Sequence, residues 1–172
     1  EQGYNAQAGV DIDTHLIVEE HVTQHTNDKQ EIAPTLENLD ALPAELGGVE
    51  ALLADTGYHS EANIERCESA GVEPLIPAKR EAHNLPLAER FCEDPQPPND
   101  PTPVQATAHR LQTRAGKTLY AKRKSTVETV FGIIKQVMGF RQFLWRGLRA
   151  VQGEWALVCI GWNLRRLFVL NG

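Results

Sequence analysis

Short β-type segments alternate with helical segments after an opening pair of strands, and this order constrains the fold more than any other feature of the sequence. Residues 4–10 alternate loosely, and residues 15–22 are rich in β-forming residues. The polar turn at 11–14 separates them, so they predict a hairpin. The next segments are a helix capped by Asn27, a strand over 49–54, a helix capped by Ser60 and a strand over 74–77. This order predicts an α/β fold with a sheet of mixed sense flanked by helices.

The C-terminal half is expected to begin with an insertion and to end in two helices, all within a single domain over 1–172. Residues 78–116 hold many prolines and little apolar periodicity, which predicts a long loop or insertion. Helical patterns follow from Lys117 and over 148–170. The apolar residues expected to be buried are Val127, Val130, Phe131, Ile134 and Met138 in the first helix and Trp155, Leu157, Val158, Ile160, Trp162, Leu164 and Phe168 in the second.

Charge is distributed unevenly along the chain. Residues 1–105 carry 5 Lys and Arg against 21 Asp and Glu, whereas residues 106–172 carry 12 against 2. Such asymmetry favours a polyanion as partner of the C-terminal part. A solvated basic helical face explains the same pattern, so the charge by itself decides nothing.

The three cysteines, Cys67, Cys92 and Cys159, are widely spaced and form no CxxC pair. Neither a zinc site nor a disulfide framework is expected, and a reducing cytoplasm is the expected location. The apolar segment 155–170 contains arginines and an asparagine, so it predicts a packed helix and not a membrane span. The chain opens on Glu1 without a methionine or a signal peptide, and we expect it to be part of a longer protein.

Two motifs carry the chemistry. Asp55 follows an apolar strand and precedes Thr56, Gly57 and Tyr58, a setting that holds a carboxylate at the end of a strand where ligands bind. An aspartate in this place also commonly caps the next helix. On the later basic helix, Glu128 shares a face with Lys124 and Lys135, four and seven residues away. An ordinary surface salt bridge is the simpler explanation of that second pattern.

Together the two motifs resemble those of the DDE transposases of bacterial insertion sequences, in particular those with a Tyr/Arg/Glu/Lys signature. Asp55 to Tyr58 is similar to their second catalytic aspartate in its Asp-x-Gly-Tyr setting. Glu128 and Lys135 match the Glu-x6-Lys part, Tyr120 matches the tyrosine, and Arg123 or Lys124 matches the basic member. Residues 3–8 with the hairpin, and the tail from 146 to 164, also resemble this family.

The resemblance implies a ribonuclease H-like fold and metal-dependent cleavage and strand transfer of DNA. In such sites two Mg²⁺ or Mn²⁺ ions are held by carboxylates, here Asp55 and Glu128, which are therefore the expected catalytic residues. DNA phosphates are expected to meet a basic and tyrosine set consisting of Tyr120, Arg123, Lys124, Lys135, Arg141 and Arg146. The implied partners are the transposon ends and the target DNA, bound by a homodimer in the bacterial cytoplasm, close to the nucleoid.

The sequence departs from the family pattern in two ways. The stricter signature has Arg four residues before the Glu, whereas Lys124 stands there and Arg123 comes one residue earlier. The family's first aspartate lies on a strand before the hairpin, which we expect upstream of Glu1. Asp11 and Asp13 fall in the turn of the hairpin and are poor substitutes. We therefore expect residues 1–172 to be inactive by themselves.

Two other functions remain open at this point. A catalytically dead DNA-binding remnant would share every feature above. A retroviral-type aspartic protease would use Asp55-Thr56-Gly57, but it requires an all-β dimer. Among the weaker candidates, His21 and His25 are expected on the surface and not at a metal site. His59 and Trp145 could touch substrate or stack on a base, although helix initiation and packing explain them as well.

Overall fold

The computed structural model describes residues 3–79 and 93–172. The chain divides into two compact units, the first comprising Glu1–Pro43 and Lys122–Gly172, and the second Ala44–Ala121. Each unit has its own strands and helices, and the two are described in turn. The whole is a mixed α/β structure, as the order of segments predicted.

The first unit is built on a hairpin. Strands β1 (Asn5–Val10) and β2 (Ile17–Thr23) pair antiparallel, with Gln7 opposite His21, and the register shifts between Gly9 and Val10. In the turn, the carboxylate of Asp11 accepts hydrogen bonds from the backbone N–H and the hydroxyl of Thr14. These bonds hold the turn closed, and the predicted hairpin is confirmed.

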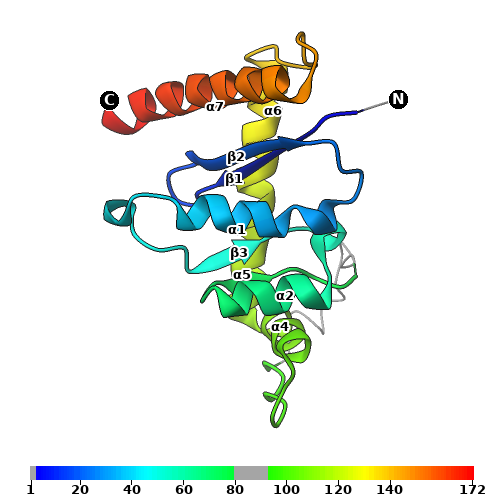
Figure 1. Ribbon diagram of the computed structural model, residues 1–172. Helices are drawn as coiled ribbons and strands as arrows, with labels where there is room; N and C mark the ends of the chain where they lie inside the picture. The colour runs from blue at the N-terminus through cyan, green and yellow to red at the C-terminus, as the bar shows by residue number, and fades with distance from the viewer. Residues whose placement is uncertain (1–2, 80–92) are drawn as a thin grey trace. The chain divides into compact units, whose positions relative to one another are not determined.

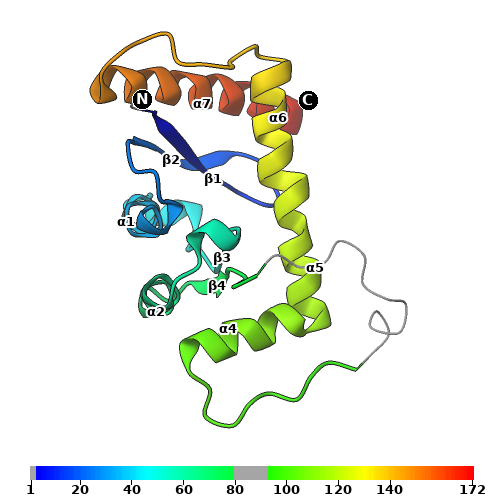
Figure 2. The same ribbon diagram turned by 90° about the vertical axis from the view of Figure 1, so that its right-hand side faces the viewer.

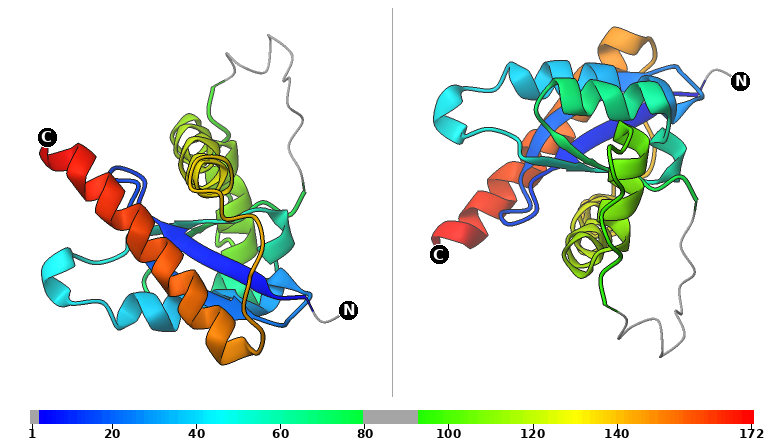
Figure 3. Two further views of the ribbon diagram at one scale, coloured as in Figure 1. Left: turned by 90° about the horizontal axis from the view of Figure 1, so that it is seen from above. Right: turned by 90° about the horizontal axis from the view of Figure 1, so that it is seen from below.

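Helices cover both faces of this hairpin. Helix α1 (Ile32–Asp40) packs on β2 from one side, and α7 (Leu148–Asn171) packs on β2 from the other (Figures 1 and 2). Seen from above, α7 lies over the hairpin (Figure 3). The sequence predicted the bounds of α7 to within a residue. At its start, Gly147 has a φ of 85°, a value that side-chain-bearing residues rarely adopt.

The core of the first unit lies between the hairpin and α7. Trp155 is its largest member; its indole stacks on Phe131, and its Nε1 donates a 2.8 Å hydrogen bond to the carbonyl oxygen of Gln7. Trp162 makes the corresponding bond to the carbonyl of His15, also 2.8 Å long. The other buried members of this core are Ile17, Val22, Val130, Ile134, Val151 and Cys159.

In the second unit, strands β3 (Ala51–Leu53) and β4 (Glu73–Leu75) pair parallel, and helix α2 (Glu61–Ser69) connects them. Ser60 caps α2 by accepting from the N–H of Asn63, as the sequence predicted. Helix α4 (Pro103–Gln112) packs on α2 and β4. The buried apolar residues here include Ile64, Cys67, Leu75, Ile76 and Leu111.

Helix α4 lies inside the segment 78–116, which the sequence predicted as a loop. Thr102 and Gln105 form a reciprocal capping box, and Pro103 stands at the first helical position. These start signals were present in the sequence but were hidden among the neighbouring prolines. Residues 80–92 of the predicted insertion lie outside the described residues.

A continuous helical stretch consists of α5 (Arg114–Arg123), a π-helical segment (Lys124–Glu128) and α6 (Thr129–Gln136). The expected apolar face is confirmed in α6, where Val130 and Ile134 are buried. The helix ends before Gly139, whose φ is 76°. The remaining elements are the 3-10 turns η1 (Asp28–Gln30), η2 (Ala44–Leu46) and η3 (Thr56–Tyr58).

Hydrogen bonding among the described residues gives two sheets of two strands each, one antiparallel and one parallel. The single sheet of mixed sense that the sequence predicted is therefore not formed among these residues; one sheet is purely antiparallel and the other purely parallel. The helices following the Asp55-Thr56-Gly57 tripeptide and forming the C-terminal part exclude the all-β aspartic protease fold. Across the described part of the chain, no helix has both the length and the apolar character needed to cross a bilayer.

Two predictions about burial are wrong. Leu157, Ile160, Leu164 and Phe168 were expected in the core, but all four are exposed on α7. The apolar residues of this helix surround it, and the hairpin covers only one side. His21 was expected on the surface, yet it is buried between β2 and α1, because two carboxylates surround its ring.

Candidate functional site

Asp55 stands two residues after the end of β3, in an extended conformation, and its side chain is exposed. One carboxylate oxygen accepts a 2.7 Å hydrogen bond from the N–H of Gly57, which caps the turn η3. The neighbouring Ala54 N–H bonds to the carbonyl of Leu75 at 3.4 Å and so ties the segment to β4. The structure thus fixes this carboxylate at a strand end and leaves it accessible to solvent.

A buried amide side chain on α2 supports the segment after Asp55. Asn63, on α2, is almost fully buried and donates a 2.8 Å hydrogen bond to the carbonyl oxygen of Tyr58. His59 is half-buried and ends η3, its N–H bonding to the carbonyl of Thr56. The turn therefore explains the position of His59 without any contact to substrate.

Glu128 closes the π-helical segment and is exposed. Its carboxylate lies 3.5 Å from the guanidinium of Arg123, five residues earlier in the chain. A π turn brings residues five apart together, whereas an α-helix brings residues four apart together. The extra residue of this turn therefore brings Arg123 within reach of Glu128.

Two hydroxyl groups stabilise the π segment. The side chains of Ser125 and Thr126 both donate to the carbonyl oxygen of Lys122, at 2.9 and 2.5 Å. A π turn disturbs the regular ladder of backbone hydrogen bonds, and hydroxyls that bond back to a carbonyl satisfy such groups. Thr126 is also buried, which anchors the turn against the rest of the first unit.

The remaining cations of the predicted set lie on exposed positions of the same unit. Lys124 and Lys135 are exposed, and the ammonium of Lys135 lies 5.8 Å from the centre of the Phe131 ring. Arg141 donates to the side chain of Gln136 at 3.1 Å. Tyr120 belongs to the second unit, on α5, where it is half-buried.

Arg146 lies in the loop between α6 and α7, which is held firmly by its neighbours. The carboxylate of Glu154 accepts from the N–H groups of Leu144 and Trp145, and the hydroxyl of Tyr4 accepts from Gly147 at 2.9 Å. Trp145 is half-exposed, so packing does not account for it fully. The loop therefore presents its arginine and tryptophan from a fixed backbone.

Asp11 and Asp13 lie in the turn of the hairpin, as predicted. Burial would raise the pKa of Asp11, but the hydrogen bonds from Thr14 outweigh it and hold the pKa below its usual value. Asp13 is exposed and lies 3.8 Å from the ammonium of Lys122. Asp11 is thus engaged in closing the turn.

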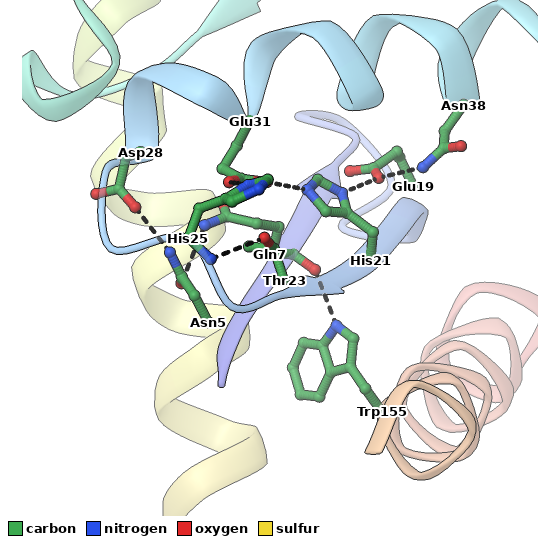
Figure 4. Close-up of polar contacts among 10 residues, drawn as sticks. All are labelled: Asn5, Gln7, Glu19, His21, Thr23, His25, Asp28, Glu31, Asn38 and Trp155. Atoms are coloured by element: carbon green, nitrogen blue, oxygen red, sulfur yellow. Dashed lines mark hydrogen bonds and ion pairs between the residues drawn. The ribbon is translucent and has the colours of Figure 1, made fainter. Parts of the chain in front are cut away.

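A buried polar cluster between β2 and α1 was missed by the sequence reasoning (Figure 4). Both ring nitrogens of His21 contact carboxylates, Nδ1 that of Glu19 at 2.7 Å and Nε2 that of Glu31 at 2.8 Å. The other oxygen of Glu31 contacts His25 at 3.0 Å, and Asn38 donates to Glu19 at 2.9 Å. The pattern His-x3-His gave no sign of it, because Glu31 comes from the following helix.

The donor chemistry of Asp55 and Glu128 suits a hard divalent cation, since both are exposed carboxylates and Mg²⁺ prefers oxygen ligands. Within residues 3–79 and 93–172, no group of three or more His, Cys, Asp or Glu side chains, around Asp55 and Glu128 or elsewhere, is arranged to hold a metal ion. The thiols are unsuited as well, because burial raises the pKa of Cys67 to about 11 and that of Cys159 to about 12. Cys92 lies outside the described residues.

Comparison with known proteins gives a match at the level of the family. The sequence matches the family model described as Transposase DDE domain over residues 1–164, which is nearly the whole chain. No curated protein and no solved structure gave a significant match. The family match implies a transposase function, with binding of DNA and use of a divalent metal ion. On this evidence the chain belongs to the transposase DDE domain family.

Proposed function

We propose that this chain supplies Asp55 and Glu128 to the metal-binding catalytic site of a transposase that cleaves DNA and joins its strands. The observation that carries the proposal is the family match over residues 1–164, a range that includes both acids; the sequence around each acid resembles a motif of this family. Both side chains are exposed. Each is therefore available to a cation and to a phosphate group.

The fold that we propose for the complete domain is ribonuclease H-like. Each of the two sheets has only two strands among the described residues, so β1 and β3 each have an open edge. An open edge presents unpaired N–H and carbonyl groups, which a further strand can satisfy. In this fold a strand that carries the family's first aspartate completes the sheet and supplies the third carboxylate.

Asp55 and Glu128 would hold Mg²⁺ or Mn²⁺ ions, which would supply Lewis-acid chemistry for the attacking and the leaving oxygen. The chain's own residues bind and orient the substrate. Arg123 forms an ion pair with Glu128 and so holds its carboxylate in place. The other N–H groups of the same guanidinium would bind a phosphate. Lys124, Lys135, Arg141 and Arg146 are exposed and would bind phosphates along the DNA. Tyr120 would donate a hydrogen bond to one of them.

The site is tested by replacing Mg²⁺ with Fe²⁺, which generates hydroxyl radicals that cut the backbone next to a bound ion. With ascorbate and peroxide, we expect cuts near both Asp55 and Glu128, because one pair of ions would contact both carboxylates. Mass spectrometry of the fragments locates the cuts. Asp55→Asn and Glu128→Gln should each weaken the cutting at both places, whereas Asp40→Asn and Glu65→Gln, at exposed acids elsewhere, should leave it unchanged.

Cuts confined to only one of the two segments would contradict a shared site. For the 172-residue chain alone, we propose binding of DNA without cleavage, because Asp11 is engaged in the hairpin turn and Asp13 lies beside it. Neither acid is a substitute for the first aspartate of the family. Nicking of a supercoiled plasmid in Mg²⁺ by this chain would show that idea to be wrong.

A further inference from the structure

Helix α7 is apolar on two opposite sides, and the first unit covers only one of them. The covered side consists of Val151, Trp155, Cys159 and Trp162, all buried against the hairpin and α6. A helix that is apolar all round is normally buried all round. The other side of α7 therefore requires an explanation.

The exposed side carries an apolar stripe with the spacing of a coiled-coil seam. It consists of Leu157, Ile160, Leu164 and Leu167, which are three, four and three residues apart. Their exposures are 62%, 54%, 64% and 42%. Phe168 lies beside the last of them and is 81% exposed. At 3.6 residues per turn, these residues, called here the α7 seam, lie opposite Trp155 and Trp162.

No charged side chain stands on the seam's side of α7 between Leu157 and Phe168; before the seam, Arg149 is exposed on that same side, about two turns from Leu157. The nearest cation in sequence, Arg165, lies well round the helix from Leu164. Arg166 is turned toward the hairpin, where its Nε donates to the carbonyl oxygen of Thr14 at 2.6 Å. A nucleic acid would therefore find no phosphate ligand along the seam. Its partner must offer an apolar surface of similar shape.

We propose that the α7 seam binds the same seam of a second copy of this chain. A two-fold axis brings a surface against its own copy, and a row of Leu and Ile at coiled-coil spacing is complementary to itself. A large apolar side chain buries roughly 100 Å² when fully covered, so the five residues would offer at most about 500 Å² per copy. A pair would therefore bury on the order of 1,000 Å², about the size at which specific interfaces begin.

The N-terminal continuation of the seam also permits close approach of two helices. Ala150 and Gly153 fall at the next positions of the same spacing, and a Cβ added at Gly153 would meet nothing within 4 Å. Small residues at such positions let helix backbones come near each other without a clash. The seam contains none of the residues proposed to bind metal or DNA. The proposal for the seam can therefore be tested independently of the proposed function.

The test is the oligomeric state of the 172-residue chain, measured by sedimentation equilibrium at micromolar concentrations. We expect a dimer. Leu164→Glu and Leu157→Glu should each weaken the dimer by roughly 100-fold or more, because a charge would be buried without a partner. Both positions are exposed, so the monomer should keep its helix content and its melting temperature.

Val169→Glu is the matched control. Val169 is 60% exposed on the same helix, five residues after Leu164 and about 140° around it. This change adds the same charge outside the seam and should leave the dimer intact. A monomeric wild-type chain, a dimer that survives both seam variants, or equal loss with Val169→Glu would each overturn the proposal. If Leu164→Glu does not fold, Leu157→Glu decides.

Discussion

The Nε2 atom of His21 lies 2.8 Å from a carboxylate oxygen of Glu31, across the buried contact between β2 and α1. Its other ring nitrogen lies 2.7 Å from Glu19, so both nitrogens face carboxylates, an arrangement that favours the doubly protonated ring. Burial alone would lower the pKa of His21, but the hydrogen bonds and charges of Glu19 and Glu31 outweigh it and raise the pKa. The cluster therefore links the packing of α1 to pH.

We expect replacement of this histidine to cost stability in a pH-dependent way. A group whose pKa is raised by folding stabilises the protein fully below its unfolded pKa, which is about 6.5 for histidine, and loses that effect as the pH rises through the folded pKa. His21→Gln should therefore cost about 3 kcal/mol at about pH 6 and less at about pH 9. Urea denaturation at a series of pH values measures the difference.

The charged groups that set this dependence are the two carboxylates at the ring nitrogens. Glu19 lies on β2, Glu31 precedes α1, and Gln7 is opposite on β1, while His25 contacts only the far oxygen of Glu31. His25 is mostly exposed, so His25→Gln is the control and should change stability little at any pH. A free-energy gap between wild type and His21→Gln that stays constant with pH would contradict the linkage.

Trp155 is buried and Trp145 is half-exposed, so their replacement should cost different amounts of stability. Trp155→Ala removes a ring packed on Phe131 and Phe140 and the hydrogen bond to Gln7, so we expect a loss of about 3–5 kcal/mol. Trp145 is 51% exposed, and Trp145→Ala should cost less than about 1 kcal/mol. Denaturation of both variants, followed by circular dichroism, measures this; equal losses would contradict the assigned core.

Much of the local structure could be predicted from the sequence. The hairpin followed from two β-type segments around a polar turn, and α2 followed from Ser60 as its cap. The length of α7 followed from its apolar character. Such features depend on neighbours in the chain, and local rules describe them well.

The remainder depends on contacts between distant segments. The sequence did not reveal that the hairpin covers only one side of α7, because apolar residues such as Leu164 and Trp162 stand on both sides of it. It did not place His21 in the interior, because Glu31 reaches it from another element. The π turn before Glu128 had only one sign, the displacement of Arg123 by one residue from the family spacing.

Two substitutions at Asp55 should separate its structural role from its proposed role at the metal. Asp55→Asn keeps an oxygen that can accept from the Gly57 N–H, so the capped turn and the melting temperature should remain nearly unchanged. Asp55→Ala removes the cap and should cost about 1 kcal/mol. Both should reduce Mn²⁺ binding, measured by electron paramagnetic resonance. Full binding by Asp55→Asn would show that the carboxylate is needed only for the turn.

Replacing the basic residues proposed to bind DNA should change how strongly the affinity for DNA depends on salt concentration. Each phosphate contact releases counterions, so removing one cation lowers the slope of log affinity against log salt by about 1. We expect this for Lys124→Ala, Lys135→Ala, Arg141→Ala and Arg146→Ala, measured by fluorescence anisotropy with a labelled duplex.

The control is Arg66→Ala, an exposed cation on α2 within the acidic part of the chain. Its slope should equal that of the wild type. Because the contacts are to phosphates, the losses should also be the same for duplexes of unrelated sequence. An Arg146→Ala variant whose loss depends on the duplex sequence would instead indicate that this loop reads bases. Unchanged slopes in all four variants would place the DNA on another surface of the protein.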